Sequence, residues 1–132
     1  MNLLNKFKAL PKRDIGLTVL IIFIILLLIL GCKTFIYGSY VSTNAVGISQ
    51  IKLENNELIV AGNIADSASG FSGYKYRIDD EKLYLKLRYS LVNDLNPSGH
   101  FSIKIVDDDL KDVKKVFFQG GKTEDIKLLL SR

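Results

Sequence analysis

Residues 82–92, KLYLKLRYSLV, decide how the larger part of this chain folds. Apolar or aromatic side chains occupy every second position from Leu83 to Leu91, and polar or charged side chains fill most positions between them. Successive side chains of a β-strand point to opposite faces of the sheet, so a period of two indicates a strand with one buried face. The segment therefore predicts a strand that lies between a core and solvent.

The same alternation recurs on both sides of this segment. Six further strand-like patterns lie at residues 46–53, 58–64, 74–78, 100–105, 116–118 and 126–130. Turn-forming residues separate them at Asn55-Asn56, 79–82, 93–99 and Gly120-Gly121. The apolar phase slips after Ile48, which predicts a β-bulge or a bend. Short strands without helical crossovers predict an all-β fold over residues 46–132, a six- to seven-stranded antiparallel sandwich or small barrel.

An uncharged apolar run, IGLTVLIIFIILLLILGC, fills residues 15–32. As a helix it would be roughly 27 Å long, close to the hydrocarbon thickness of a bilayer. Before it stand Lys6, Lys8, Lys12 and Arg13. Only Lys33 stands just after it. Excess Lys and Arg stay on the cytoplasmic side, so we expect a single-pass protein of the cell membrane with residues 1–14 cytoplasmic and the β domain extracytoplasmic.

Two interpretations of the apolar run stay open. One is an uncleaved transmembrane anchor, and the other is a lipoprotein signal peptide that ends in the box Ile29-Leu30-Gly31-Cys32, where Cys32 would carry the lipid. Both place the β domain outside the membrane. Residues 33–45 are expected to form a tether, with Tyr37 and Tyr40 at the membrane–water interface.

The basic character of the chain comes from its first 40 residues. They carry five Lys or Arg and one Asp, which accounts for the whole formal charge of +4. Residues 41–132 carry 13 Lys or Arg and 13 Asp or Glu, so they are formally neutral. A nucleic-acid-binding domain normally has a net basic surface. We therefore expect no nucleic-acid partner.

Candidate catalytic and metal-binding residues are few. Cys32 and His100 are the single cysteine and the single histidine, so an intramolecular disulfide and a cysteine-built metal site are excluded. Carboxylates cluster at 107–112, but they lack the ligand spacing of an EF-hand loop, and capping of a short turn that contains Leu110 explains them better. An envelope hydrolase or metal-dependent enzyme that uses His100 or the Asp107–Asp112 cluster is the alternative function. We predict no cofactor.

Two regions are candidates for binding. Phe71 lies in a loop of small residues, SASGFSG, where it would either contact a partner or close one end of the sandwich. Tyr84, Lys86 and Arg88 share the polar phase of their strand. Aromatic and Arg side chains are typical of interface hot spots, although cross-strand pairs of the same residues also stabilise ordinary sheets.

The order of segments resembles a known kind of protein. GYKYRI (73–78), KLYLKLRYSLV (82–92), SGHFSIKI (98–105), DLKDVKKVFFQGG (109–121) and EDIKLLL (124–130) follow one another as in small anchored or lipoprotein-like proteins of Gram-positive bacteria. The resemblance implies one β domain behind an apolar segment and implies no activity. We therefore expect a non-enzymatic binding module of the bacterial envelope, with the lipid bilayer and another envelope protein or a wall polymer as partners.

Overall fold

The computed structural model describes residues 12–132, so most of the expected basic segment at 1–14 lies outside the described residues. Contacts divide the chain into two units, with a boundary after Cys32. In the first unit, α2 spans Lys12–Cys32, and the second unit begins with the helical turn η1, Lys33–Tyr37. The helical run Lys12–Tyr37 has 26 residues and contains an 18-residue stretch with a mean hydropathy of 3.2, so it is long and apolar enough to cross a membrane. A signal sequence has the same properties.

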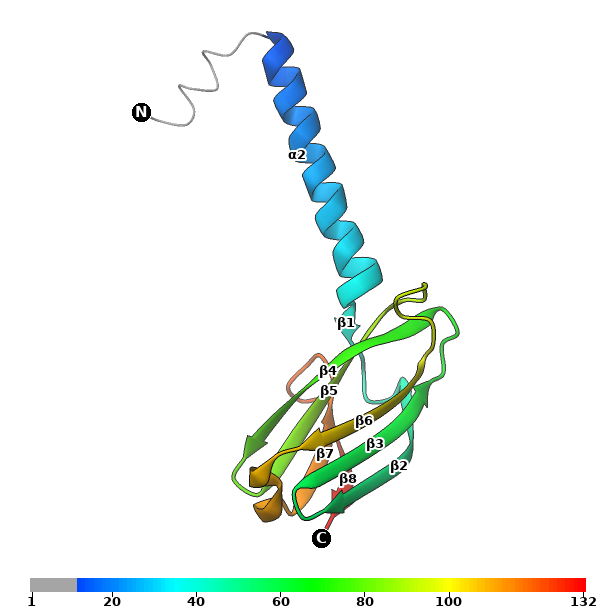
Figure 1. Ribbon diagram of the computed structural model, residues 1–132, viewed down its shortest axis with the longest axis vertical. Coiled ribbons are helices and arrows are strands. Elements are labelled where there is room, and N and C mark those ends of the chain that lie inside the picture. The colour runs from blue at the N-terminus through cyan, green and yellow to red at the C-terminus, as the bar shows by residue number, and fades with distance from the viewer. Residues whose placement is uncertain (1–11) are drawn as a thin grey trace, which may run out of the picture. The chain divides into compact units, whose positions relative to one another are not determined.

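The second unit is a β-sandwich of two sheets that face each other (Figure 1). The five-stranded sheet contains β1 Ser39–Tyr40, β4 Ser69–Asp79, β5 Lys82–Leu91, β7 Lys115–Gln119 and β8 Ile126–Ser131. The three-stranded sheet contains β2 Val46–Glu54, β3 Glu57–Ile64 and β6 His100–Val106. A short 3-10 helix, η2 Asp108–Asp112, connects β6 to β7.

The all-β class and the sandwich are confirmed, and the sheets do not close into a barrel. Two details differ from the prediction. The described residues form eight strands, because the two-residue β1 adds one strand to the seven patterns. The pairing of β5 with β7 is parallel, whereas all other pairs are antiparallel. A parallel pair needs a long connection, and residues 92–114 supply it by passing through β6 of the other sheet.

The core lies between the two sheets and follows the predicted alternation. Leu83, Leu85 and Leu87 of β5 are fully buried, and Ile103 and Ile105 of β6 face them from the other sheet. Turn chemistry also follows the prediction. Asn55 and Asp80 adopt left-handed backbone angles, with φ of 49° and 54°, in the hairpins β2–β3 and β4–β5. The bulge predicted after Ile48 is confirmed by a register shift between Ile48 and Gln50.

Residues 33–45 do not form a separate tether, because the β unit begins at Lys33. Ser39 and Tyr40 form β1, which pairs with Tyr89 and Arg88 of β5. The amide side chain of Asn96 donates to the carbonyl oxygens of Phe35 and Ile36, each at 3.1 Å, and that of Asn93 donates to Phe35 O at 2.6 Å. The terminal carbonyls of a helix lack partners within the helix, so these asparagines satisfy η1 from the β sandwich.

Candidate functional site

Three residues of the expected contact surface lie together on the outer face of the five-stranded sheet. Tyr84, Lys86 and Arg88 take alternate positions of β5 and are half-buried, whereas the leucines between them are fully buried. Directly paired residues share a face, so β4 and β7 add side chains to the same surface. We call this surface the basic face. Its members are Lys75, Arg77, Asp79, Lys82, Tyr84, Lys86, Arg88, Lys115 and Phe117.

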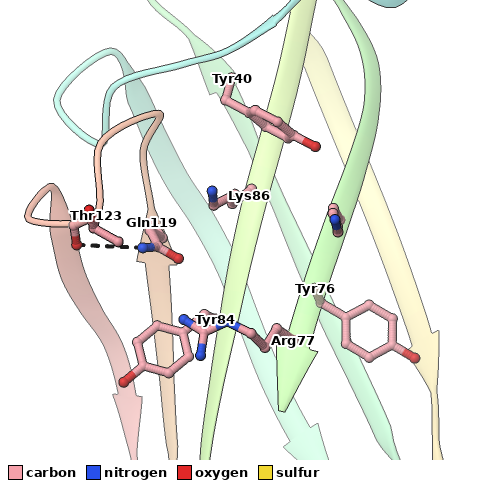
Figure 2. A pocket seen from close by; sticks show the side chains of 8 residues that line it. Tyr40, Tyr76, Arg77, Tyr84, Lys86, Gln119 and Thr123 are labelled. Carbon is pink, nitrogen blue, oxygen red and sulfur yellow. Dashed lines mark hydrogen bonds between the residues drawn. The ribbon is translucent and has the colours of Figure 1, made fainter. Parts of the chain in front are cut away.

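A groove of about 280 Å³ lies on the basic face. Strand β1 pairs with β5 at Arg88 and Tyr89, and β7 pairs with the same side of β5 at residues 82–85. The groove lies along the stretch of β5 between these two pairings. Its lining residues are Tyr40, Lys75, Tyr76, Arg77, Tyr84, Lys86, Gln119 and Thr123. The ring of Tyr76 is directed away from Tyr84 and Lys86 (Figure 2), because Tyr76 belongs to the inward phase of β4. The remaining side chains give the groove a basic and aromatic lining.

Cations and aromatic rings contact one another along this groove. The guanidinium carbon of Arg77 lies 4.3 Å from the ring centre of Tyr84, and the ammonium nitrogen of Lys86 lies 5.1 Å from that of Tyr40. Tyr84 in turn stacks on Phe117 with 5.3 Å between ring centres. A ring face attracts a cation without accepting its N–H groups in the way an oxygen does. These contacts therefore position the two cations and leave donors for another ligand.

Arg88 occupies the end of the basic face next to η1. Its guanidinium lies 3.9 Å over the ring of Tyr37, and Ser72 Oγ donates to the carbonyl oxygen of Tyr37 at 2.5 Å. A side chain at Gly73 would collide with the Arg88 guanidinium, so glycine permits this close approach. The Nε atom of Arg88 is buried and has no hydrogen-bond partner among residues 12–132.

The basic face carries strong uncompensated charge. Six Lys or Arg and one Asp give it a formal charge of +5. Within residues 12–132, Arg77 is the one cation of this face with a carboxylate at ion-pair distance, at 3.5 Å from Asp79. Lys75 lies directly opposite Lys86 in the register, and Lys82 lies opposite Lys115. Like charges directly opposite each other destabilise a sheet.

Two polar side chains complete the groove. Gln119 is only 2% exposed, and its amide nitrogen donates a long 3.5 Å bond to the carbonyl oxygen of Thr123 (Figure 2). Such a bond is at the outer limit of useful geometry. A side-chain hydrogen bond with Tyr37, followed by desolvation, raises the pKa of Tyr40 above its usual 10.0. Tyr40 therefore keeps its hydroxyl proton at neutral pH, and that proton is shared with Tyr37.

The loop that carries Thr123 is fastened to the turn after β1. Thr43 donates to the carboxylate of Asp125 twice, from Oγ1 at 2.5 Å and from its backbone nitrogen at 3.1 Å. These bonds lower the pKa of Asp125 below its usual 3.8. Asp125 is therefore ionised at neutral pH and holds the two segments together beside the groove.

Phe71 is separated from the other three candidate residues. The SASGFSG segment is not a free loop, since β4 begins at Ser69. The Phe71 ring packs 5.7 Å from Tyr89 and 5.5 Å from Phe101, centre to centre, on the inner side of the sheet. Of the two interpretations of Phe71, the structure favours the plug that closes one end of the sandwich.

The residues of the alternative enzyme function do not assemble into a site. Asp107 caps η2, because its carboxylate accepts from Asp109 N and from the Tyr76 hydroxyl, each at 2.9 Å. The bond to Asp107 raises the pKa of Tyr76. His100 is exposed at the start of β6, and residues 12–132 contain no group of three or more His, Cys, Asp or Glu placed to hold a metal.

Several residues of the groove were not predicted as site residues. Lys75 and Arg77 had a usable signal, since they share the polar phase of the pattern at 74–78. The sequence placed Tyr40 at a membrane interface, because the pairing of β1 with β5 has no sequence signature. Gln119 gave no signal at all, since nothing local indicates which strands lie beside β7. Cys32 is an exposed free thiol at the end of α2, and its lipidation stays a prediction.

Comparisons of the chain with models of protein families, with curated proteins and with solved structures found no match. The resemblance to small anchored proteins of Gram-positive bacteria therefore stays a prediction. The features of the described residues that bear on function are the apolar helix, the basic face and its groove.

Proposed function

We propose that this protein is a non-enzymatic binding module of the bacterial cell envelope. The helical run Lys12–Tyr37 holds it at the membrane, and the β unit lies on the extracytoplasmic side. Its contact surface is the basic face, whose middle strand β5 carries Tyr84, Lys86 and Arg88. The partner is an envelope component that carries negative charge, either a protein or a wall polymer.

The observation that carries this proposal is the charge of one sheet surface. Residues 41–132 are formally neutral, yet the basic face concentrates a charge of +5. The matching carboxylates lie mainly in turns, such as Asp107–Asp112. Aromatic and basic surfaces also bind nucleic acids. An extracytoplasmic position argues against such a partner and supports an envelope component.

Crosslinking on intact cells tests the contact surface. A photo-reactive amino acid replaces Thr123, which lines the groove, or Ser102, which is exposed on the outer face of the three-stranded sheet. We expect adducts from position 123 and few or none from position 102. Equal adducts at the two positions, or none at position 123, would overturn the proposal that the basic face is the contact surface.

The anchor and its orientation need separate measurements. The intact mass of the membrane-extracted protein separates the two interpretations of Cys32: a full-length chain supports the anchor, and a chain that starts at Cys32 with added acyl mass supports the lipoprotein. For orientation, Ser102→Cys in a Cys32→Ser background is treated with a membrane-impermeant maleimide. We expect labelling on intact cells. Labelling that requires broken cells would place the β unit in the cytoplasm and overturn the proposed location.

A further inference from the structure

The centre of the groove contains an unfavourable arrangement that a ligand would relieve. Lys75 and Lys86 are directly opposite each other on neighbouring strands, and no carboxylate among residues 12–132 pairs with either of them. Both side chains line the groove. An opposite cross-strand charge would stabilise the sheet, whereas this pair destabilises it. A bound anion between the two ammonium groups would reverse the sign of the interaction.

Two other side chains of the groove, Arg77 and Gln119, provide hydrogen-bond donors that differ in geometry from the lysine ammonium groups. Arg77 is positioned over the ring of Tyr84 by a 4.3 Å contact, and a guanidinium offers two parallel N–H groups to one oxyanion. Gln119 lines the same groove although it is only 2% exposed, and within residues 12–132 its side-chain amide has one long 3.5 Å bond. A buried amide with such weak bonding is expected to have a better partner in the functional state.

The geometry points to a phosphoryl-binding site in this groove, in which Lys75, Lys86 and Arg77 hold the oxygens of a phosphate ester. This inference rests on the proposed function and names the ligand chemistry of the same surface. The shared chemistry is a phosphate ester, whether it belongs to a lipid headgroup or to a soluble or polymeric phosphate.

A phosphate ester fits this set of donors better than a carboxylate. Three cations line the groove and one of them already has a carboxylate partner, Asp79. A phosphate monoester carries about −1.5 to −2 charges at pH 7 and offers three acceptor oxygens, so it can contact both lysines and Arg77 at once. The volume of about 280 Å³ is close to the lower end for small-molecule sites, which leaves room for the group esterified to the phosphate.

The test uses the full chain in dodecyl maltoside micelles, which are uncharged and contain no phosphate. Glycerol 3-phosphate is titrated at constant ionic strength, and backbone amide and lysine side-chain NMR shifts are recorded. We expect saturable shifts at Lys75 and Lys86, and none at Lys52 and Lys104 on the other sheet. Each lost charge-assisted hydrogen bond weakens binding about tenfold or more. The variant Lys75→Gln/Lys86→Gln should therefore bind at least tenfold more weakly.

A matched variant controls for charge alone. Lys52→Gln/Lys104→Gln removes the same two charges from exposed strand positions on the opposite face and should bind glycerol 3-phosphate as the unchanged chain does. Both double variants change exposed or half-buried side chains, and their tyrosine near-ultraviolet circular dichroism reports whether the fold is kept. Equal weakening in the two folded variants would overturn the site.

A second arm identifies the source of the phosphate. Phosphatidic acid, a lipid whose headgroup is a phosphate monoester, is added to the micelles, with diacylglycerol as the phosphate-free control. Shifts at Lys75 and Lys86 with phosphatidic acid support a lipid headgroup, and shifts with glycerol 3-phosphate alone support a soluble or polymeric ester. No saturable shift with either compound, or shifts equal to those of sodium chloride, would overturn the inference. Adducts at position 123 in the cell experiment would then still support a binding module with a different ligand.

Discussion

The outer faces of the two sheets differ in their net charge and in how their charged side chains are paired. On the three-stranded sheet, Lys52 pairs with Glu54 at 3.3 Å and Lys104 pairs with Glu57 at 3.5 Å. The charged side chains of that face therefore sum to zero. The basic face carries +5, and two of its register positions set lysine against lysine. The three-stranded sheet has one such like-charge pair, Glu54 opposite Glu57, but both carboxylates have a lysine partner. A surface that serves only solubility gains from mixed charge, so the comparison supports the binding role proposed for the five-stranded sheet.

Aromatic residues sharpen the contrast. On the basic face, Tyr84 stacks between Arg77 and Phe117, and Tyr40 lies under Lys86. The outer face of the three-stranded sheet has no aromatic residue among its strand positions. Ring contacts let cations keep a fixed position without a carboxylate that would compete with an anionic ligand. The two faces therefore differ in side-chain chemistry although they belong to one sandwich.

The largest expected effect on the free energy of unfolding comes from the core. It tests whether the inner faces of the two sheets form one shared apolar core, although their outer faces differ in charge. Leu85→Ala should lower the free energy of unfolding by about 2–5 kcal/mol, because a fully buried leucine leaves a cavity. Ile103→Val, on the facing sheet, should cost only about 0.5–1.5 kcal/mol. Urea unfolding of the full chain in micelles, followed by near-ultraviolet circular dichroism, measures both. A cost below 1 kcal/mol for Leu85→Ala would show that the sheets do not share a packed core.

A smaller effect is expected from the hydrogen bond that joins the two sheets. Tyr89 of the five-stranded sheet donates from its hydroxyl to the carbonyl oxygen of Gly99, just before β6, at 2.8 Å. Tyr89→Phe should lower the free energy of unfolding by about 0.5–1.5 kcal/mol. If the free energy of unfolding of this variant is unchanged, the hydrogen bond between Tyr89 and Gly99 does not contribute to holding the two sheets together.

Burial of Tyr89 also makes the stability of the fold depend on pH. It raises the pKa of Tyr89 to about 12 from the usual 10.0. Because the folded state favours the protonated form, the associated stability is fully present below pH 10 and is lost as the pH rises towards 12. Tyrosinate absorbance is therefore titrated in the unchanged chain and in Tyr89→Phe. The difference between the two curves should be centred near pH 12. A difference titration centred near 10 would contradict the burial.

The sequence predicted what depends on local alternation. The leucines of residues 82–92, the hairpin at Asn55 and the bulge after Ile48 all follow from periodicity and turn chemistry, and the structure confirms them. The outward group Tyr84, Lys86 and Arg88 was found in the same way, since a strand fixes which side chains share its face. The central part of the candidate site was therefore visible in one strand.

The rest of the site depends on which strands become neighbours. Nothing local indicates that β7 runs parallel to β5, and this pairing brings the strand that ends at Gln119 to the groove. The pairing of β1 with β5 likewise brings the Tyr40 ring under Lys86, although the segment that contains Tyr40 resembles a linker in sequence. Formal neutrality of residues 41–132 also concealed the basic face, because a sum of charges carries no information about which face holds them.

The smallest expected effect bears most directly on the difference between the faces. Lys75→Glu converts a like-charge pair with Lys86 into an opposite-charge pair and should raise the free energy of unfolding by about 0.2–1 kcal/mol. Lys104→Glu, on the other sheet, removes the ion pair with Glu57 and should lower it by a similar amount. Thermal unfolding in micelles, at low ionic strength and without phosphate, should therefore give midpoints that move in opposite directions, by roughly 1–6 °C. If both midpoints fall, the lysine pair is not a source of strain, and the contrast between the two faces loses its energetic basis.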